Sequence, residues 1–344
     1  MAVTDLHEPV SKQSGGEPDP VVSVANLSKR FGEVEAVRGV SFTVAPGEAF
    51  AFLGPNGAGK STTISILCTL LRPTSGRAAV AGFDVLEDPL GVRRHIGLVF
   101  QDPTLDDYLT AEENLRFHAQ LYRVPASQIA RRLDEVLAMV ELTERRHSLV
   151  RTFSGGMKRR LEIARGLMHS PRVLFLDEPT VGLDPQTRAH IWSYINELRV
   201  REHITMFLTT HYMDEAENCE RLAIIDHGEI VATGTPEALK EAVGKDRIEL
   251  HVDDPAEAID ELRDEFGIEA RLSEGFVAFH VAGAEEFAPR LLAELRTPTR
   301  SIRIARPTLD DVFMAYTGRT IRDAEASASE RMHSRPMARA RMRR

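Results

Sequence analysis

The stretch that decides the fold reads Gly54-Pro55-Asn56-Gly57-Ala58-Gly59-Lys60-Ser61-Thr62. Its pattern, G-x-x-x-x-G-K-S, is that of a loop that cradles the phosphates of a nucleoside triphosphate. The glycines let the backbone turn tightly enough to point several N–H groups at one phosphate chain. Lys60 adds positive charge near the β- and γ-phosphates, and Ser61 offers a hydroxyl to Mg²⁺.

The residues on either side of this loop provide the strand and the helix that the motif requires. Residues 49–53 form a short apolar run, which predicts a buried strand. Behind the loop we expect a helix that reaches residue 71, because apolar residues recur at helical spacing: Ile64, Leu67, Leu70 and Leu71. The N-terminus of such a helix attracts anions, so loop and helix would serve one phosphate site.

The composition limits the class of protein. With 344 residues, 42% of them hydrophobic and 28% charged, the chain is ordinary globular material with room for about two domains. Its formal net charge of −9 argues against nucleic acid as a partner. Cys68 and Cys219 form no disulfide framework or metal-ligand cluster, and we interpret both as inert thiols in a reducing cytoplasm. No apolar run approaches the ~20 residues that span a bilayer.

The sequence predicts four parts, and the fourth is a C-terminal tail. Residues 1–20 carry acidic residues and no apolar core, which indicates a disordered lead-in and not a signal peptide. Residues 21–244 form an α/β unit, in which about 102–170 is a helical insert with a capping box at Thr110. Residues 245–318 follow the order strand, helix, strand, strand, helix, strand, which predicts a small ferredoxin-like α/β domain.

The last part, residues 319–344, is polar and basic. After Glu330 it holds no acidic residue and six arginines, namely Arg331, Arg335, Arg339, Arg341, Arg343 and Arg344. We interpret it as a disordered, solvated tail. A contact with anionic lipid or with an acidic loop of a partner is the alternative.

Two further segments supply chemistry that a phosphate loop needs. Asp177 and Glu178 follow an apolar run at 173–176, and the carboxyl end of a central parallel strand faces the ligand crevice of an open α/β sheet. One carboxylate there can hold Mg²⁺, and the other can orient or deprotonate an attacking water. A second anion-binding turn precedes an apolar-patterned helix and reads Ser154-Gly155-Gly156.

On these residues the sequence resembles the ATP-binding subunit of an ABC (ATP-binding cassette) transporter, over about residues 21–240. Residues 54–62 resemble Walker A, 173–178 resemble Walker B, and 153–157 resemble the signature motif. The adenine-stacking aromatic residue, the Q-loop, the D-loop and the H-loop of the family fall at Phe31, Gln101, Asp184 and His211. The signature reads Phe-Ser-Gly-Gly-Met where the family usually has Leu-Ser-Gly-Gly-Gln, and the aromatic residue is Phe where Tyr is commoner.

Two segments narrow the resemblance to the daunorubicin-resistance type of drug-export ATPase. They are the switch region at 211–217, His-Tyr-Met-Asp-Glu-Ala-Glu, and residues 307–313, Pro-Thr-Leu-Asp-Asp-Val-Phe. That group also carries a small domain after the cassette. The resemblance therefore implies an α/β fold: a P-loop ABC-type nucleotide-binding domain with a helical subdomain, followed by a small ferredoxin-like C-terminal domain.

The resemblance also implies roles for the motif residues, with ATP and Mg²⁺ as the expected cofactors. In a homodimer, each ATP would lie between the Walker A loop of one subunit and the Ser-Gly-Gly turn of the other, and Asp184 would couple the two sites. Glu178 would polarise the attacking water and His211 would orient Glu178. Mg²⁺ would be held by Ser61, Gln101 and Asp177. The nucleotide would be bound by Phe31, Gly54, Pro55, Asn56, Gly57, Ala58, Gly59, Lys60, Ser61, Thr62, Ser154, Gly155, Gly156 and Asp184.

The partner that the resemblance implies is a separate membrane permease. The chain would sit peripherally on the cytoplasmic face of the cell membrane and drive efflux of a hydrophobic, drug-like compound. The segment from Gln101 through Asp106, Asp107 and Tyr108 would form the groove for a coupling helix of the permease. The cargo stays open: an antibiotic, a lipid or another hydrophobic compound.

The sequence also bears on functions other than export. A soluble cassette ATPase acting on ribosomes or DNA is disfavoured, because the chain has one cassette and no long coiled coil between Walker A and the signature. Glu178 and His211 argue against a non-hydrolysing nucleotide switch, and an import ATPase is the nearest alternative. Apart from His211, we predict surface positions for six histidines: His7, His118, His147, His169, His203 and His333.

Overall fold

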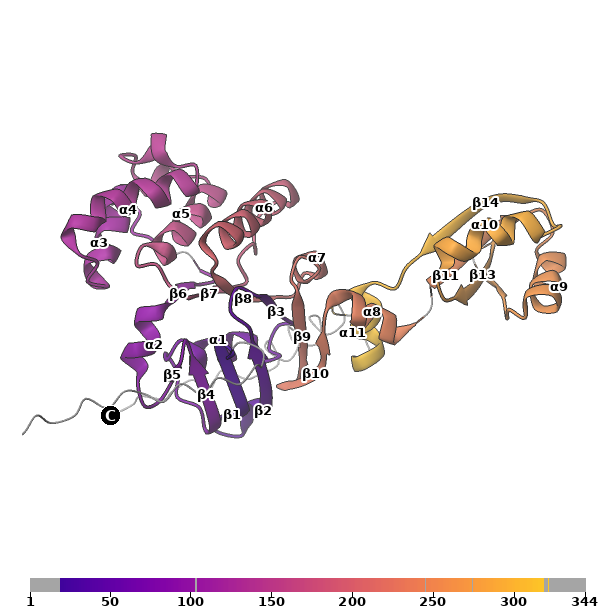
Figure 1. The fold of residues 1–344 in the computed structure, drawn as a ribbon, viewed down its shortest axis with the longest axis horizontal. Helices are drawn as coiled ribbons and strands as arrows, with labels where there is room; N and C mark the ends of the chain where they lie inside the picture. Colours follow the sequence, from indigo (N-terminus) through magenta and orange to yellow (C-terminus); the bar gives the residue numbers. More distant parts are fainter. Residues whose placement is uncertain (1–18, 103, 245, 274, 319–320, 322–344) are drawn as a thin grey trace, which may run out of the picture.

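The computed structural model describes residues 19–102, 104–244, 246–273, 275–318 and 321. The expected lead-in, apart from its last two residues, and the arginine-rich tail from residue 322 onward lie outside the described residues, as do His7 and His333. Figure 1 shows a larger body that contains the N-terminal two thirds of the chain and a smaller body at one end of the long axis. None of the described helices is long and apolar enough to cross a membrane.

A six-stranded sheet lies at the centre of the larger body. Its strand order is β10 (Glu229–Gly234), β9 (Arg221–Asp226), β3 (Ala49–Leu53), β8 (Thr205–Thr210), β7 (Val173–Asp177) and β6 (Ile96–Val99). All neighbours run parallel except β10, which pairs antiparallel with β9 through the turn at His227 and Gly228. The apolar runs predicted as strands before the phosphate loop and before Asp177 are thus neighbours of β8, and their carboxyl ends meet at one edge.

Both faces of this sheet are buried, which explains why its strands are apolar throughout. In β3, Phe50 and Phe52 point into one core cluster, while Ala49, Ala51 and Leu53 point into another. The first cluster lies between the central sheet and a second sheet, and its phenylalanine rings pack in stacked and tilted pairs with centroids 5.3–5.7 Å apart. The second cluster lies under the helices.

The second sheet is antiparallel, with the order β2 (Val34–Val44), β1 (Val22–Phe31), β4 (Ser75–Val80) and β5 (Phe83–Asp84). We predicted only short strands near residues 21–24 and 41–44. The structure instead has one long hairpin of ten and eleven residues, with irregular register between Val24 and Arg30. Its outer half is exposed and polar, so the apolar alternation that signals a strand is missing there.

Helices cover the other face of the central sheet and form the predicted helical insert. They are α3 (Ala111–Leu121), α4 (Ala126–Met139) and α5 (Gly155–Leu167), joined by two short 3₁₀ turns at Thr143–Arg145 and Val150–Thr152, and followed by α6 (Pro185–Glu202). The predicted capping box is confirmed, because Thr110 and Glu113 exchange hydrogen bonds at the start of α3. Two short helices, α2 (Pro89–His95) and α7 (Met213–Ala216), had no clear sequence signal.

The helix after the phosphate loop, α1 (Lys60–Leu67), is shorter than predicted. It ends before Leu70, because Thr69 takes a left-handed conformation with φ 60°. Leu70 is consequently 55% exposed and does not continue the buried face. Leu67 therefore belongs to the helix, whereas Leu70 and Leu71 belong to the turn that follows it.

The smaller body is a four-stranded antiparallel sheet with the order β12 (Arg271–Ser273), β13 (Phe276–Val281), β11 (Asp246–Val252) and β14 (Thr299–Ala305). Helices α9 (Pro255–Phe266) and α10 (Ala284–Glu294) complete the order βαββαβ. We call residues 246–305 the accessory unit. Its own core contains Leu250, Leu262, Phe279 and Leu291, all at most 1% exposed.

The accessory unit is connected to the larger body through two helices that pack together, α8 (Pro236–Val243) and α11 (Leu309–Thr317). Leu309, Val312 and Phe313 of α11 are fully buried in the cluster that contains Leu239 of α8 and the helical side of the central sheet. The chain thus leaves the larger body after α8 and returns to it with α11. The domain limits predicted at 244/245 and 318/319 stay predictions.

Candidate active site

The phosphate loop connects β3 to α1, and its shape depends on close backbone approaches. Gly59 begins α1 in a left-handed conformation with φ 109°, and no side chain caps the helix. A Cβ at Gly54 would lie 2.2 Å from the carbonyl oxygen of Ile225, and one at Gly59 would lie 2.5 Å from that of Ala36. Glycine is therefore required at both positions. The uncapped first turn of α1 is the kind of N-terminus that binds a phosphate.

Lys60 is buried at the centre of the loop, with 3% of its surface exposed. Its Nζ donates hydrogen bonds to the carbonyl oxygens of Gly54 (2.7 Å) and Pro55 (3.1 Å). The same Nζ lies 3.2 Å from Oε1 of Glu178, at the end of β7. An ammonium group is therefore held where the phosphate loop meets the carboxylates.

Ser61 and Asp177 meet beside this ammonium group. The Ser61 hydroxyl donates to Oδ1 of Asp177 at 3.1 Å, and the Thr209 hydroxyl of β8 donates to the same oxygen. Burial raises the pKa of Asp177, although the hydrogen bonds from Thr209 and Ser61 oppose the rise. A hydroxyl and a carboxylate are hard oxygen ligands of the type that Mg²⁺ prefers.

The oxygen pair is consistent with a Mg²⁺ ion that binds together with phosphates. Among the residues that the structure describes, no group of three or more His, Cys, Asp or Glu side chains could hold a metal ion. Mg²⁺ in nucleotide sites is typically bound through one or two carboxylates plus substrate phosphates and water, so a full set of protein ligands is not needed.

Glu178 follows Asp177 and is 5% exposed. Its backbone takes φ 46°, a strained conformation for this residue type, and its N–H donates to the carbonyl and hydroxyl oxygens of Thr209. Oε1 lies 3.5 Å from Nδ1 of His211, beyond the end of β8. Burial tends to raise the pKa of Glu178, but the hydrogen bond from His211 and the charge of Lys60 outweigh it and lower the pKa.

The other predicted residues take part in separate contacts. Ser154 caps α5, and its hydroxyl accepts from the N–H of Met157 at 3.3 Å. Asp184 caps α6 and accepts from the N–H of Thr187 at 3.0 Å. A Cβ at Gly156 would lie 2.8 Å from Cγ2 of Thr187, so the signature turn and the D-loop turn of one chain are in contact.

Phe31 and Gln101 lie on the surface. Phe31 ends β1 with 48% of its surface exposed, and Nζ of Lys29 lies 5.0 Å from the centre of its ring. Gln101 is exposed just after β6. An exposed aromatic face is available for stacking, and an exposed amide is available to a ligand.

Several residues near the site had no sequence signal. The Thr209 hydroxyl donates to the Asp177 carboxylate and, together with the Thr209 carbonyl, accepts from the backbone N–H of Glu178, yet Thr209 looks like an ordinary β-branched strand residue. The ring of Tyr212 packs between His211, at 4.1 Å, and the guanidinium of Arg188, at 3.7 Å. Only a three-dimensional structure brings these residues of α6, β7 and β8 together.

The prediction for the remaining histidines is partly wrong. His147 and His203 are exposed as expected, but His118 and His169 both pack against the Tyr122 ring, with centroids 4.5 and 4.0 Å from it and 5.7 Å from each other. Burial lowers the pKa of His118 to about 3 and that of His169 to about 4. Both rings are therefore neutral at ordinary pH. Cys68 and Cys219 are both buried, with free thiols.

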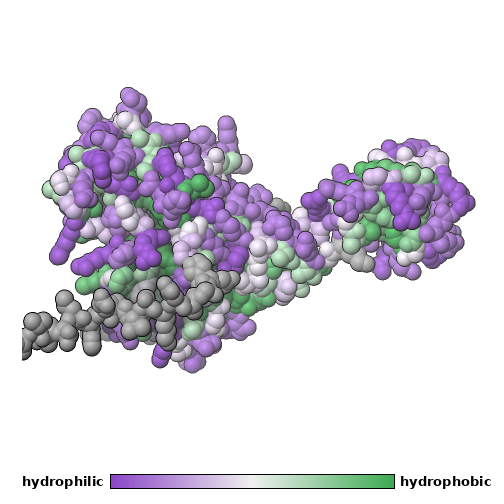
Figure 2. All heavy atoms as spheres, in the orientation of Figure 1, coloured by the Kyte–Doolittle hydropathy of each residue, from purple (hydrophilic) through white to green (hydrophobic). Residues whose placement is uncertain are grey.

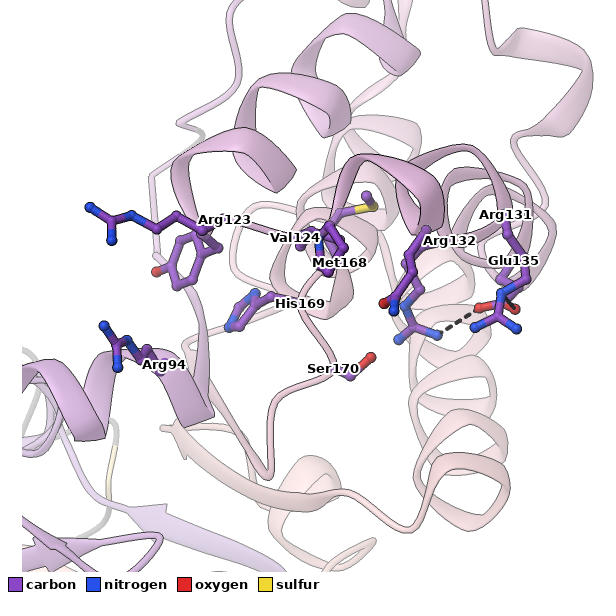
Figure 3. A pocket seen from close by; sticks show the side chains of 12 residues that line it. Arg94, Arg123, Val124, Arg131, Arg132, Glu135, Met168, His169 and Ser170 are labelled. Carbon is purple, nitrogen blue, oxygen red and sulfur yellow. Dashed lines mark hydrogen bonds and ion pairs between the residues drawn. The ribbon is translucent and has the colours of Figure 1, made fainter.

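A hollow of about 510 Å³ lies away from the phosphate loop, between α2, α4 and the end of α5. Figure 3 shows Arg94 and Arg123 at one end of this hollow and Arg131 with Arg132 at the other. Glu135 pairs with Arg131 and Arg132. None of the residues predicted to bind the nucleotide lines this hollow.

Comparison with known proteins covers nearly the whole described chain. Residues 37–181 match the family described as ABC transporter, and residues 234–317 match the ATP-binding protein DrrA1-3-like, C-terminal domain. The daunorubicin resistance ATP-binding protein DrrA3 of Streptomyces coeruleorubidus is 37% identical, over 90% of this chain and 99% of its own. The linearmycin resistance ATP-binding protein LnrL of Bacillus subtilis is 39% identical, over 88% and 100%. The Nod factor export ATP-binding protein I of Burkholderia lata is also 39% identical, over 89% and 100%.

Solved structures are similar to the larger body. The cbiO1 protein of Clostridium perfringens, part of the ABC transporter complex cbiONQ, is 29% identical with a TM-score of 0.61, over 66% of this chain and 94% of its own. A dimeric ATP-binding cassette in a post-hydrolysis state, bound to ADP and phosphate, is 30% identical with a TM-score of 0.56, over 62% and 98%. The predicted fold class, with a P-loop ABC-type domain, is confirmed.

Proposed function

The chain belongs to the ATP-binding subunits of ABC transporters and hydrolyses ATP, and from that premise we propose that it powers export of a hydrophobic, drug-like compound through a separate membrane permease. The names of its relatives support this cargo class: two confer resistance to daunorubicin or linearmycin, and one exports Nod factor. None of these relatives is a ribosomal factor, so the ribosomal alternative has no support.

The observation that carries the catalytic part of the proposal is the contact group at the ends of β3, β7 and β8. Three segments far apart in sequence meet here through their side chains. Lys60 lies 3.2 Å from Glu178, Ser61 lies 3.1 Å from Asp177, and His211 lies 3.5 Å from Glu178. The group offers a cation for the phosphates, two oxygens for Mg²⁺, and a carboxylate whose lowered pKa keeps it ionised.

The nucleotide would enter this group from the phosphate loop. The uncapped amides of α1 and the ammonium of Lys60 would bind the phosphates, and Phe31 would stack on the adenine. In this structure Lys60 contacts Glu178, and we expect the phosphates to draw the ammonium away and leave the carboxylate for water. Mg²⁺ would be held by Ser61, Asp177 and Gln101, and it would neutralise charge that develops on the phosphates.

The chemical step then follows from the position of Glu178. A water oxygen attacks the γ-phosphorus while the bond from that phosphorus to the β–γ bridging oxygen breaks, and ADP leaves with the bonding electrons. Glu178 orients the water and takes its proton. His211 holds the carboxylate through Nδ1, and Tyr212 and Arg188 stack behind the imidazole.

Pairing of two copies would complete the site. Ser154, Gly155 and Gly156 begin α5, and we propose that they bind the ATP held on the Walker A loop of a second copy. Asp184 caps the neighbouring helix α6, and the contact between Gly156 and Thr187 would link its position to that of the signature turn.

The test of the catalytic proposal is ATP hydrolysis by the full-length protein with Mg²⁺. Glu178→Gln keeps the shape of the side chain but removes the base, and the exposed Glu144→Gln is a matched control. We expect Glu178→Gln to bind ATP and to lose hydrolysis, while Glu144→Gln behaves as wild type. Hydrolysis at the wild-type rate by Glu178→Gln would contradict the proposed role.

A permease surface is proposed on the helical side, near α3. Tyr108, Phe117 and Leu121 are exposed by 81%, 62% and 66%, and a hollow of about 300 Å³ lies beside Phe117 and Leu121. Exposed apolar residues that gather in one place mark interaction sites. We propose that a cytoplasmic helix of the permease packs here, which would hold the chain peripherally at the membrane.

Cross-linking in membranes tests this partner. Tyr108→Cys should form a disulfide with a cysteine in a cytoplasmic loop of the permease, whereas the exposed His280→Cys on the accessory unit should not. The Glu178→Gln protein, trapped with ATP, should also retain an integral membrane protein during purification from detergent-solubilised membranes. Recovery of ribosomes, or equal cross-linking at both positions, would contradict the permease proposal.

A further inference from the structure

Arg159 is a buried charge on the helix that follows the signature turn. It lies five positions after Ser154 on α5, and only 6% of its surface is exposed. Arginine is almost never buried without partners, because removing a guanidinium group from water is costly. The contacts that compensate for this burial show what the side chain does.

The first set of contacts joins Arg159 to the backbone that carries the catalytic carboxylates. Nε donates to the carbonyl oxygen of Pro179, and Nη2 donates to those of Asp177 (3.4 Å) and Glu178 (3.3 Å). Three successive carbonyl groups at the end of β7 thus converge on one guanidinium group. Since Glu178 has a strained backbone with φ 46°, these bonds help to keep it in that conformation.

The second set of contacts reaches the Q-loop. Nη1 of Arg159 donates to the carbonyl oxygen of Phe100 and to Oε2 of Glu162 at 2.9 Å. The other oxygen of Glu162, which is 1% exposed, accepts from the N–H of Thr104 at 2.7 Å. Gln101 therefore lies between two residues, Phe100 and Thr104, that are both hydrogen-bonded to α5.

All five N–H groups of the guanidinium have an acceptor, four of them backbone carbonyls and one the Glu162 carboxylate. The planar fork is needed for this arrangement. A lysine ammonium at the same place has three N–H groups on one nitrogen and cannot reach both segments with the same geometry.

We propose that Arg159 and Glu162 form a positioning pair that fixes Gln101 and Glu178 relative to α5. Movement of α5, the helix that follows the signature turn, would then be transmitted to Gln101 and to Glu178. The inference rests on the proposed function, because it assumes that Gln101 and Glu178 act on ATP. Neither Arg159 nor Glu162 touches the nucleotide in this proposal. They act through the backbone of Phe100 and Thr104 and of residues 177–179.

The neighbouring Arg160 provides a matched control on the same helix. Its Nη1 donates to the carbonyl oxygen of Val140 and pairs with Glu141 at 3.0 Å, so both contacts stay within the helical region. Loss of Arg160 removes an arginine and its hydrogen bonds from α5 without disturbing the Q-loop or Walker B. Any effect specific to Arg159 therefore reports on the positioning contacts.

The experiment compares three variants of the full-length protein with wild type. Arg159→Lys keeps the positive charge and its pairing with Glu162 but loses the planar guanidinium group that reaches both backbone segments. Arg159→Met with Glu162→Gln removes both charges together, so no unpaired charge is left buried, and the glutamine oxygen can still accept from Thr104. Arg160→Met is the control. ATP affinity, kcat and KM are measured for each, together with backbone hydrogen exchange over residues 100–104 and 177–181.

We expect both Arg159 variants to bind ATP within about threefold of wild type but to show kcat lowered by roughly 30- to 100-fold, because a misplacement of about 1 Å has such an effect. Hydrogen exchange should accelerate in the two named segments and stay unchanged in the cores of β3 and β8. Arg160→Met should keep kcat within about threefold of wild type.

The inference would be overturned if kcat in the Arg159 variants equalled kcat in Arg160→Met, whether all three variants stay near wild type or all three fall. If the double variant fails to fold, Arg159→Lys alone decides between these outcomes. The Glu178→Gln variant keeps the proposed function separate. If Glu178→Gln hydrolyses ATP, the proposed function fails, and if it is inactive while Arg159→Lys matches Arg160→Met, only the positioning role fails.

Discussion

The cassette, which is the larger body, and the accessory unit are both α/β structures with helices packed on a sheet. They differ in how deeply their charged residues are buried. The cassette buries Lys60, Arg159, Glu162, Asp177 and Glu178, each at most 9% exposed. Among the residues described between 246 and 305, no charged residue is buried as a whole, although the side chain of Glu261 is only 8% exposed and pairs with Arg296. The ion pairs of Arg263, Arg290 and Arg300 lie at the surface. Figure 2 shows hydrophilic residues over most of the visible surface of both bodies.

This difference separates residues that serve chemistry from residues that serve folding. A buried charge lowers stability unless it is fully paired, so it persists where it has another use. The five buried charges named above lie around the phosphate loop and the end of β7. The described residues of the accessory unit enclose an ordinary apolar core. Four predictions test this contrast.

Glu178→Gln should have the largest effect. The substitution removes the proposed base at the centre of the buried charges, and we expect kcat for ATP hydrolysis to fall by roughly 10²–10⁴-fold. A steady-state phosphate-release assay measures this change. Because Glu178→Gln keeps a hydrogen-bonding side chain, the melting temperature should change little, and a large drop in it would mean that the residue is structural.

Phe279→Ala tests the accessory unit through its core. Phe279 is 1% exposed, and its truncation should lower the stability of the unit by about 3–5 kcal/mol. We expect a separate unfolding transition of the unit in calorimetry at lower temperature. ATP hydrolysis at temperatures below that transition should stay within about threefold of wild type. Loss of hydrolysis before the unit unfolds would break the separation between the two regions.

The third prediction concerns how the stability of the protein depends on pH through two histidines of the cassette, His118 and His169. Burial lowers their pKa values to about 3 and about 4, below the ordinary value of 6.5, so the unfolded chain binds protons that the folded chain does not. Stability should therefore fall as the pH falls below 6.5. At pH 5.5 each histidine lowers the free energy of unfolding by about 1.4 kcal/mol relative to pH 8.

The measurement is chemical denaturation between pH 8 and pH 5. Replacing both residues by glutamine should flatten the pH dependence, whatever its effect on stability at pH 8. His280→Gln in the accessory unit is the control, because His280 is exposed and its loss should leave the slope unchanged. Equal slopes for wild type and the double variant would show that the buried histidines do not cause the acid sensitivity.

Arg290→Gln should have the smallest effect. Arg290 pairs with Glu294 one turn along α10, and the two side chains are 66% and 49% exposed. We expect a change of less than about 0.5 kcal/mol in the stability of the accessory unit, since exposed pairs contribute little. A loss above about 1 kcal/mol would mean that surface charges stabilise this unit, contrary to the comparison.

Much of the fold was predictable because its signals are local. The phosphate loop, the strand before Asp177 and the caps at Thr110 follow from spacing over a few residues. In the accessory unit, the observed order of strands and helices is the predicted order βαββαβ. The same local signals failed for the outer half of the β1–β2 hairpin, where pairing alone maintains the strands.

The site was predictable where a motif defines it and hidden where long-range contacts do. Arg159 lies in the run Lys158-Arg159-Arg160, which reads as a solvated helix face. Its burial depends on the carbonyl groups of Phe100 and Pro179, which no local pattern places beside it. Thr209 was missed for the same reason, because a threonine in a strand is ordinary until its neighbour is known to be Asp177.

The position of α11 has a consequence for the order in which the protein can be made. Leu309, Val312 and Phe313 fill the same core as Leu239 of α8, yet the ribosome synthesises them only after the whole accessory unit. During synthesis the apolar surface around α8 therefore stays exposed to solvent until α11 has been made. The accessory unit is complete before that point and can fold first. A chain that stops at residue 305 would contain every nucleotide-binding motif and would still expose an unfinished core.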